Sequence, residues 1–143
     1  MYLGFYSELA RRDVVKAREI IAEHGYSSAP DDIRRFRREL ARNPIVELQS
    51  LTECPDFFST SECRDLLFNV QEHLLTLGKI ESFLTEMDLH FIGFELDRSV
   101  LHRYRARFAG DPSCTNLRNW ASFEADNPDT FSGMYQFWVQ KPL

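Results

Sequence analysis

Residues 135–141 read YQFWVQK, a stretch in which apolar and polar side chains roughly alternate. A period of two is typical of a β-strand, because successive side chains point to opposite faces of the sheet. Two further short apolar runs, 2–6 and 89–95, are rich in aromatic residues and also predict strands. The sequence therefore predicts about three strands, and residues 135–141 form the last of them.

Between these strands, apolar residues recur at helical spacing, and local signals predict where the helices begin and end. Ser7 is expected to cap a first helix that Gly25 ends. Pro30 suits the first position of a second helix, and Asn43-Pro44 ends it. Residues 45–58 are expected to make one or two turns before the Cys54-Pro55 break.

The remaining helices are predicted from their amino-terminal capping residues. The sequence of residues 59–62, STSE, is a capping box that opens a helix reaching about His73. Thr76, Asp97 and Thr115 are expected to cap three more helices. The predicted order is strand, about four helices, strand, two helices, strand. This is an α/β protein with few strands for its helices, and its sheet has a poorly protected edge.

Composition places the chain among soluble globular domains. Its 143 residues include 43% hydrophobic and 27% charged residues, ordinary values for a domain with a real core. The net charge of -5 argues against wholesale binding to nucleic acid or to an acidic membrane, because phosphate affinity requires a cationic surface. No apolar run is long enough to span a bilayer, and the amino terminus has no basic segment of a signal peptide. A cytoplasmic protein is expected.

Motifs for common chemistries are missing from the sequence. The cysteines, Cys54, Cys63 and Cys114, are odd in number and have no CxxC spacing, which favours reduced thiols. The four histidines have no metal-ligand spacing with one another or with the cysteines, so a metal site is not expected. The arginines of residues 34–42 could face a phosphate, but neighbouring acidic residues favour a solvated helix face.

Several blocks of sequence resemble one family. They are residues 6–8 (YSE), 56–68 (DFFSTSECRDLLF), 70–73 (VQEH), 91–95 (FIGFE) and 127–141 (NPDTFSGMYQFWVQK). Together they are similar to the carboxy-terminal region of bacterial class I S-adenosylmethionine-dependent methyltransferases, of the type often attached to tetratricopeptide repeats. Leu74-Leu75 departs from the family, which has a more polar pair there.

The resemblance implies a partial Rossmann-like methyltransferase sheet with a large helical insertion. Residues 2–6 would be the fifth strand, 77–95 the last crossover helix and the sixth strand, and 135–141 the antiparallel seventh strand between the fifth and the sixth. Residues 1–143 would form a single domain. In it, residues 9–75 would be a substrate-cap-like helical insertion, and residues 1–8 and 76–143 would belong to the α/β core.

The resemblance also implies what this chain would lack. Class I enzymes hold the cofactor on a glycine-rich turn after the first strand and on an acid that ends the second. The six glycines here form no GxG, and both strands would lie before residue 1. We therefore expect no cofactor to bind this chain alone, although S-adenosylmethionine serves the full-length family. Met1 would align with an internal methionine of a longer protein, and independent methyl transfer is not expected.

Four residues are candidates for substrate binding. Tyr6 and Ser7 follow the first strand at its carboxyl end, where α/β proteins bind ligands, although a helix cap explains Ser7 equally well. Arg64 and His73 would share a polar helix face, and His73 could act as a general base in a full-length relative. Capping and pairing within the helical block is the competing interpretation of both residues. Catalytic residues are not identified.

Two functions remain open from the sequence. The first is the substrate-recognition and core-completing portion of a methyltransferase. The second is a non-enzymatic interaction module, in which the exposed edge strand 2–6 pairs with a partner chain or with a second copy, and a homodimer would be the simplest form. In the first case the same edge would receive the missing amino-terminal half of the enzyme.

Overall fold

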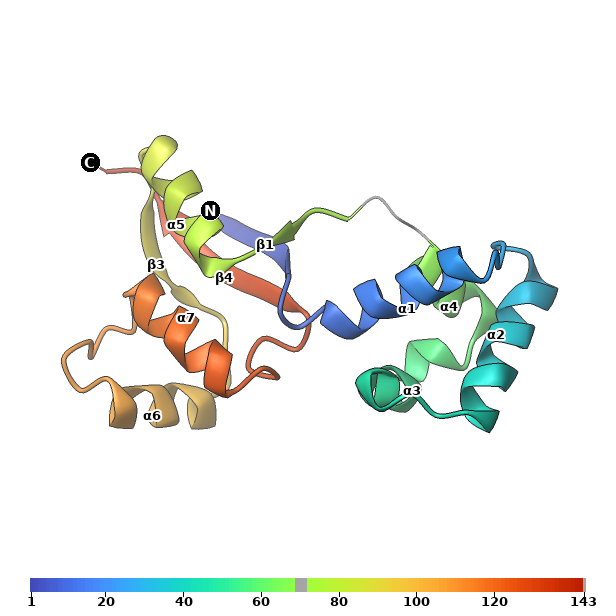
Figure 1. Cartoon of the computed structure of the whole chain (residues 1–143). Helices are drawn as coiled ribbons and strands as arrows, with labels where there is room; N and C mark the ends of the chain where they lie inside the picture. The colour runs from blue at the N-terminus through green and yellow to red at the C-terminus, as the bar shows by residue number, and fades with distance from the viewer. Residues whose placement is uncertain (69–71, 143) are drawn as a thin grey trace. The chain divides into compact units, whose positions relative to one another are not determined.

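The computed structural model describes residues 1–68 and 72–142. The chain forms two compact units (Figure 1), one made of Met1–Ala10 and His73–Leu143, the other of Arg11–Glu72. We call them the sheet unit and the helical unit. The segment predicted to be an insertion, residues 9–75, contains the whole of the helical unit.

The sheet unit contains four strands: β1 (Tyr2–Ser7), β2 (Leu74–Leu75), β3 (His90–Phe94) and β4 (Met134–Gln140). Their order in the sheet is β2-β1-β4-β3. Strand β4 runs antiparallel to both of its neighbours, whereas β1 and β2 are parallel. The predicted strand at 135–141 is thus confirmed, as is its antiparallel position between the other two long strands.

The prediction of about three strands is wrong by one, because Leu74–Leu75 forms the short strand β2. It pairs only with Tyr6 and Ser7 of β1. The amino-terminal part of the β1 edge, Tyr2–Phe5, has no strand beside it among the described residues of this unit. A two-residue strand has no internal periodicity, so the sequence pattern could not predict it.

Helices α5 (Leu77–Glu86) and α7 (Leu117–Asp126) pack on one face of this sheet, and α6 (Arg98–Arg107) joins the same core through Tyr104, which stacks on Trp120 of α7. Their inward residues and the alternate residues of β4 make one apolar core, which a group of stacked aromatic rings dominates. Its fully buried members are Trp120, Tyr104, Tyr135, Phe137, Leu77, Ile80 and Val139. The opposite face of the sheet carries the exposed side chains of Tyr2, Ile92 and Trp138.

The helical unit contains α1 (Arg12–Glu23), α2 (Pro30–Arg42), α3 (Gln49–Glu53) and α4 (Thr60–Phe68). Two short 3₁₀ turns, Val46–Leu48 and Pro55–Phe57, flank α3. A second apolar core holds this unit together, and its members do not overlap with the first. Its buried residues are Val14, Ala17, Ile21, Ile33, Phe36, Leu40, Leu48, Leu51, Phe57, Cys63 and Leu67.

Most helix ends predicted from local signals are confirmed. The second helix begins at Pro30, and its carboxy-terminal cap is Asn43. Gly25 follows the first helix with φ +67°, a left-handed conformation that favours glycine. Thr76 caps α5 by accepting a hydrogen bond from the Lys79 amide at 3.2 Å.

Other predicted ends are wrong. Ser7 belongs to β1, and α1 begins five residues later at Arg12 without a side-chain cap. Asn116 rather than Thr115 caps α7, whereas Asp97 is the N-cap residue of α6 as predicted, although its side chain makes no capping hydrogen bond. The neighbouring Asn116 replaces the expected cap of α7, and the Ser7 hydroxyl donates to Glu124.

The helix predicted to reach about His73 does not extend that far. Helix α4 ends at Phe68 in the part of the chain that is described, and Val70, which was expected to face inward, lies outside it. Glu72 and His73 are not helical. Leu74 begins β2, and its pairing with β1 requires an extended backbone there.

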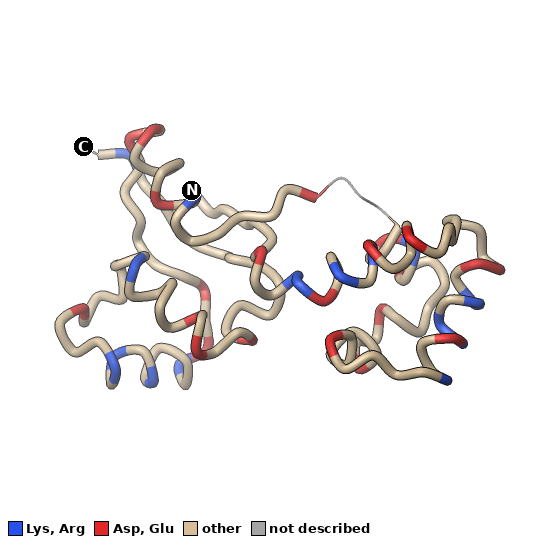
Figure 2. The backbone as a smooth tube through the Cα atoms, viewed as in Figure 1, with Lys and Arg blue, Asp and Glu red and all other residues tan. Residues whose placement is uncertain are grey.

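No helix in residues 1–68 and 72–142 combines the length and the apolar character needed to cross a bilayer. Acidic and basic residues are interspersed along the backbone of both units (Figure 2).

Candidate functional site

The carboxyl ends of the parallel strands lie at one edge of the sheet unit. Strand β1 ends at Ser7, and the strand parallel to it ends beside it at Leu75. Strand β3 reaches the same edge, where the Glu95 amide donates to the Gln136 carbonyl at 2.8 Å. In α/β proteins, ligands bind at this edge, so its polar residues are the first to consider.

Ser7 is the central polar residue of this edge and is completely buried. Strand alternation points its side chain to the helix-covered face, together with Leu3 and Phe5. Its hydroxyl oxygen accepts a hydrogen bond from the Ala10 amide at 3.1 Å, which shapes the turn after β1. Ser7 therefore caps a turn instead of a helix.

The hydroxyl of Ser7 donates to a carboxylate from the far end of the chain. Ser7 Oγ lies 2.8 Å from Oε1 of Glu124, which is 4% exposed on helix α7. The Tyr135 hydroxyl donates to the same carboxylate, at 2.9 Å from Oε1 and 2.8 Å from Oε2. We call Ser7, Glu124 and Tyr135 the buried polar cluster.

The protonation of this cluster is set mainly by burial. Desolvation raises the pKa of Glu124, although the hydrogen bonds from Ser7 and Tyr135 favour its charged form and oppose the shift. Burial also raises the pKa of Tyr135, and the neighbouring carboxylate adds to this effect. Tyr135 therefore remains a hydrogen-bond donor at neutral pH.

The buried polar cluster is closed to solvent and tied to three elements. Ser7 is on β1, Glu124 on α7 and Tyr135 on β4, and none of the three side chains reaches the surface. The cluster can therefore fix the carboxyl end of β1 relative to the helix layer, but it cannot touch a substrate in this conformation. Its role in this structure is to hold the carboxyl end of β1 in place against the helix layer.

Sequence reasoning identified Ser7 but missed its two partners. Glu124 lies seven residues after Leu117 and four after Trp120, on the same apolar helix stripe. A charged residue at a core position of such a stripe is the signal that could have found it. Tyr135 lies on the inward-facing positions of β4 together with Phe137 and Val139.

The other two candidate residues of the sheet unit, Tyr6 and His73, are not members of the cluster. Tyr6 is half-buried and points to the opposite face of β1 from Ser7, since neighbouring strand residues alternate. His73 is exposed and comes immediately before β2 in the sheet unit. Leu74, which follows His73, pairs with Tyr6, so within the sheet unit His73 lies one residue from the strand partner of Tyr6.

Arg64 lies in the helical unit, where it makes a structural contact. Its Nε donates to the Ser28 carbonyl at 3.0 Å, which ties α4 to the turn between α1 and α2. In the same unit, Glu72 pairs with Arg11 at 3.3 Å and with Arg18 at 3.2 Å. These contacts are the capping and pairing of the competing interpretation.

The arginines of α2 lie beside acidic residues of the same helix. Arg34 pairs with Asp31 at 2.9 Å, and Arg35 lies 3.5 Å from Asp32. Figure 2 shows basic and acidic residues interspersed along this helix. Such exposed pairs stabilise a helix only slightly, and they reduce its positive charge.

The strand-to-helix turns do not fit a nucleoside cofactor. A cradle of this kind needs glycine, because a Cβ prevents the close approach of backbone to ligand. The turns after β1, β2 and β3 contain no glycine.

The acids beside two of these turns already have partners. Glu8 pairs with Lys79 at 2.9 Å, and Glu95 accepts from the Trp138 indole at 3.1 Å. In residues 1–68 and 72–142, no group of three or more His, Cys, Asp or Glu is placed to hold a metal ion.

The sequence matches no protein-family model, and a search of curated proteins found no significant match.

Proposed function

We propose that this chain is the substrate-recognition and core-completing portion of a class I S-adenosylmethionine-dependent methyltransferase, inactive in methyl transfer alone. The sequence blocks at 56–68 and 127–141 resemble that family. The observation that carries the proposal is the position of β4, antiparallel between β1 and β3. A single antiparallel strand inserted among parallel ones is the arrangement that the resemblance implies.

The helical unit would contribute to substrate recognition. The chain leaves the sheet unit after Ala10, three residues beyond the end of β1, and returns at His73, directly before β2. It therefore departs from the carboxyl end of β1, the end where α/β proteins bind ligands. The glycine-free turns support the expectation that the cofactor is held by residues outside this chain.

Complementation tests the proposal. The purified chain is titrated calorimetrically with S-adenosylhomocysteine, alone and mixed with a recombinant amino-terminal methyltransferase segment that ends before the fifth strand. We expect saturable binding only in the mixture, with the chain folded by circular dichroism in both cases. Equal binding with and without the chain would contradict the proposal.

The variant Gly4→Pro tests whether the complementation uses the edge of β1. The Met1 backbone exchanges hydrogen bonds with Val139 of β4, and the Ser7 amide donates to the Gly133 carbonyl just before β4. Because antiparallel pairing alternates, the Gly4 N–H points to the other edge of β1. Proline at such a position removes one edge donor and leaves the β4 ladder intact. The variant is expected to remain folded and to lose the complementation.

A second candidate function is self-association through the same edge. Tyr2 and Gly4 both present their backbone groups away from β4, beyond the part of β1 that β2 covers. An antiparallel copy centred on Leu3 would pair each Tyr2 with the other Gly4. Sedimentation over a hundredfold concentration range would then show a dimer that Gly4→Pro abolishes, whereas a concentration-independent monomer excludes this function.

A further inference from the structure

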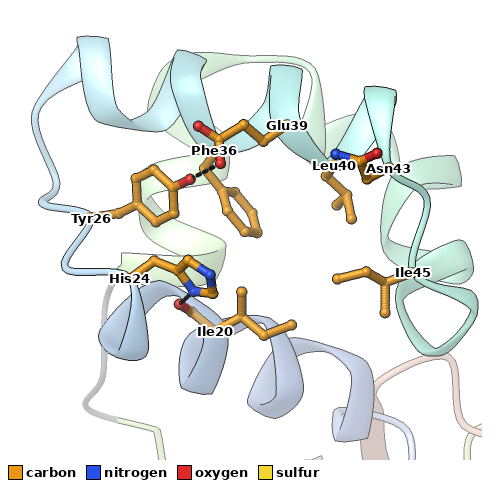
Figure 3. Close-up of a pocket in the computed structure, with 8 residues that line it drawn as sticks. All are labelled: Ile20, His24, Tyr26, Phe36, Glu39, Leu40, Asn43 and Ile45. Atoms are coloured by element: carbon orange, nitrogen blue, oxygen red, sulfur yellow. Dashed lines mark hydrogen bonds between the residues drawn. The ribbon is translucent and has the colours of Figure 1, made fainter.

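A cavity of about 190 Å³ lies in the helical unit. It is bounded by the end of α1, by α2 and by the segment after α2, so all its walls belong to one compact unit. Figure 3 shows the side chains around it, which are Ile20, His24, Tyr26, Phe36, Glu39, Leu40, Asn43 and Ile45.

One part of this cavity is apolar. Phe36 and Leu40 are buried in the core of the unit, at 3% and 4% exposure, and Ile20 and Ile45 pack against that core. In Figure 3 the Ile20 and Ile45 side chains point toward each other across the space. These side chains would remove the apolar part of a ligand from water, which favours binding.

The rest of the lining is polar and consists mainly of hydrogen-bond acceptors. The Tyr26 hydroxyl donates to the Glu39 carboxylate, which leaves the phenol oxygen as an acceptor. That hydrogen bond and partial burial raise the pKa of Tyr26, so its proton stays on the phenol. Glu39 itself brings a formal negative charge to the rim.

His24 adds a further acceptor. Its Nδ1 lies 3.0 Å from the Ile20 carbonyl, so a neutral ring that donates from Nδ1 keeps Nε2 as an acceptor. In Figure 3 this second nitrogen faces the space between the two helices. The side-chain amide of Asn43 adds a donor to the lining.

The positive charge nearest to Glu39 among the described residues lies outside the lining. The Arg35 guanidinium is 4.7 Å from the Tyr26 ring centroid, and its Nε is 4.0 Å from Glu39 Oε1. Arg35 is half-exposed and does not line the cavity, and an ion pair this exposed is weak. An acceptor-rich rim with one carboxylate therefore complements a donor-rich cation.

We propose that this pocket binds a small primary amine carried on an apolar ring or short chain, with the ammonium group at Glu39 and the apolar part on Phe36 and Ile45. An ammonium group has three donors and no acceptor, which matches Glu39, Tyr26 and His24. The inference depends only on the lining of the helical unit and is independent of the proposed methyltransferase relationship.

A comparison of three probes on the intact chain tests this assignment without any variant. The probes are 2-phenylethylamine, 2-phenylethanol and phenylacetate, which share a ring and differ in the charge of the head group. We expect only the amine to bind measurably, with Kd on the order of 1 mM for so small a ligand. In a ¹H–¹⁵N spectrum, the amide shifts should centre on Ile20, Tyr26 and Asn43.

Glu39→Gln and Glu47→Gln form a matched pair of variants. Both remove one negative charge, but only Glu39 lines the pocket, whereas Glu47 is exposed on the 3₁₀ turn that follows. We expect Glu39→Gln to weaken amine binding roughly fivefold and Glu47→Gln to leave it unchanged.

Two results would overturn the proposal. One is equal binding of the amine and the alcohol, and the other is a set of shifted amides outside the helical unit. Thermal unfolding of each variant identifies any loss of binding that comes from loss of fold.

Discussion

At the scale of single residues, the least ordinary feature is a carboxylate in an apolar core. Glu124 is 4% exposed and receives its hydrogen bonds from the hydroxyls of Ser7 and Tyr135. No salt bridge to Glu124 is formed by the described residues, so no positive charge offsets its desolvation. A buried charge without an ionic partner is costly, which is why its pKa is raised.

This raised pKa makes the stability of the protein depend on pH. Since the pKa of Glu124 is higher in the folded than in the unfolded state, its favourable contribution is complete below the unfolded pKa. It is lost as the pH rises through the folded pKa. In Glu124→Gln this loss is absent. The stability of the wild type relative to the variant should therefore fall with increasing pH, by at most about 1.4 kcal/mol per pH unit.

Urea unfolding between pH 4 and pH 8 measures this difference. A parallel pH profile for the two proteins would mean that Glu124 has the same pKa in the folded and unfolded states. Glu124→Leu serves as a comparison, because it removes both the charge and the acceptors of Ser7 and Tyr135.

The Tyr135 hydroxyl makes a second test at this scale. Tyr135→Phe removes the donor to both carboxylate oxygens and leaves Ser7 as the remaining side-chain donor to Glu124. We expect a loss of about 1–3 kcal/mol in the free energy of unfolding at pH 7, from urea titration. Tyr2→Phe is the control, because Tyr2 is 44% exposed and a change at the surface should stay within about 0.5 kcal/mol. Equal losses of unfolding free energy in the two variants would mean that the buried polar cluster contributes little to stability.

At the scale of elements, the ends of helices depend on single backbone positions. Gly25 has φ +67° after α1, and its amide donates to the Ala22 carbonyl at 3.2 Å. The Tyr26 amide reaches the Ile21 carbonyl at 3.0 Å, which completes the turn that directs the chain toward α2. The conformation of one glycine thus decides how the first two helices meet.

Substitution of Gly25 by alanine tests this dependence. A Cβ there would meet no atom within 4 Å, so any cost comes from the left-handed backbone. We expect Gly25→Ala to destabilise the protein by about 1 kcal/mol, measured by thermal unfolding. Gly110→Ala is the control, since Gly110 also has open space but no positive φ. A loss at Gly110 equal to that at Gly25 would exclude the conformational explanation.

At the scale of the whole molecule, the protein has two separate apolar cores. One is formed by α5, α6, α7 and the sheet, and the other by the helices of Arg11–Glu72. Since apolar burial is the main favourable term in folding, two cores without shared members suggest two cooperative units.

Native-state hydrogen exchange tests this cooperativity with a pair of core variants. Ile33 and Ile80 are both fully buried, one in each core. Ile33→Ala and Ile80→Ala should each cost about 2–5 kcal/mol in their own unit. We expect Ile33→Ala to reduce amide protection in α2 but not in β4, and Ile80→Ala to do the reverse. Loss of protection throughout the chain in both variants would show a single cooperative unit.

Much of the fold follows from local signals in the sequence. The alternation at 135–141, Pro30 and Asn43 around α2, and Gly25 after α1 each act on their own segment of backbone. Period and backbone preference are properties of a few neighbouring residues, so the sequence alone determines them. The long strands and the cores of most helices were therefore predictable.

Tertiary structure alone decided the rest. Strand β2 has two residues and exists because Tyr6 and Ser7 provide the pairing. The buried polar cluster joins Ser7 to Glu124 across 117 positions in the chain, and the pocket of the helical unit joins the end of α1 to Ile45. No local pattern encodes such contacts, because they form only when the sheet and helix layers bring distant residues together and bury them.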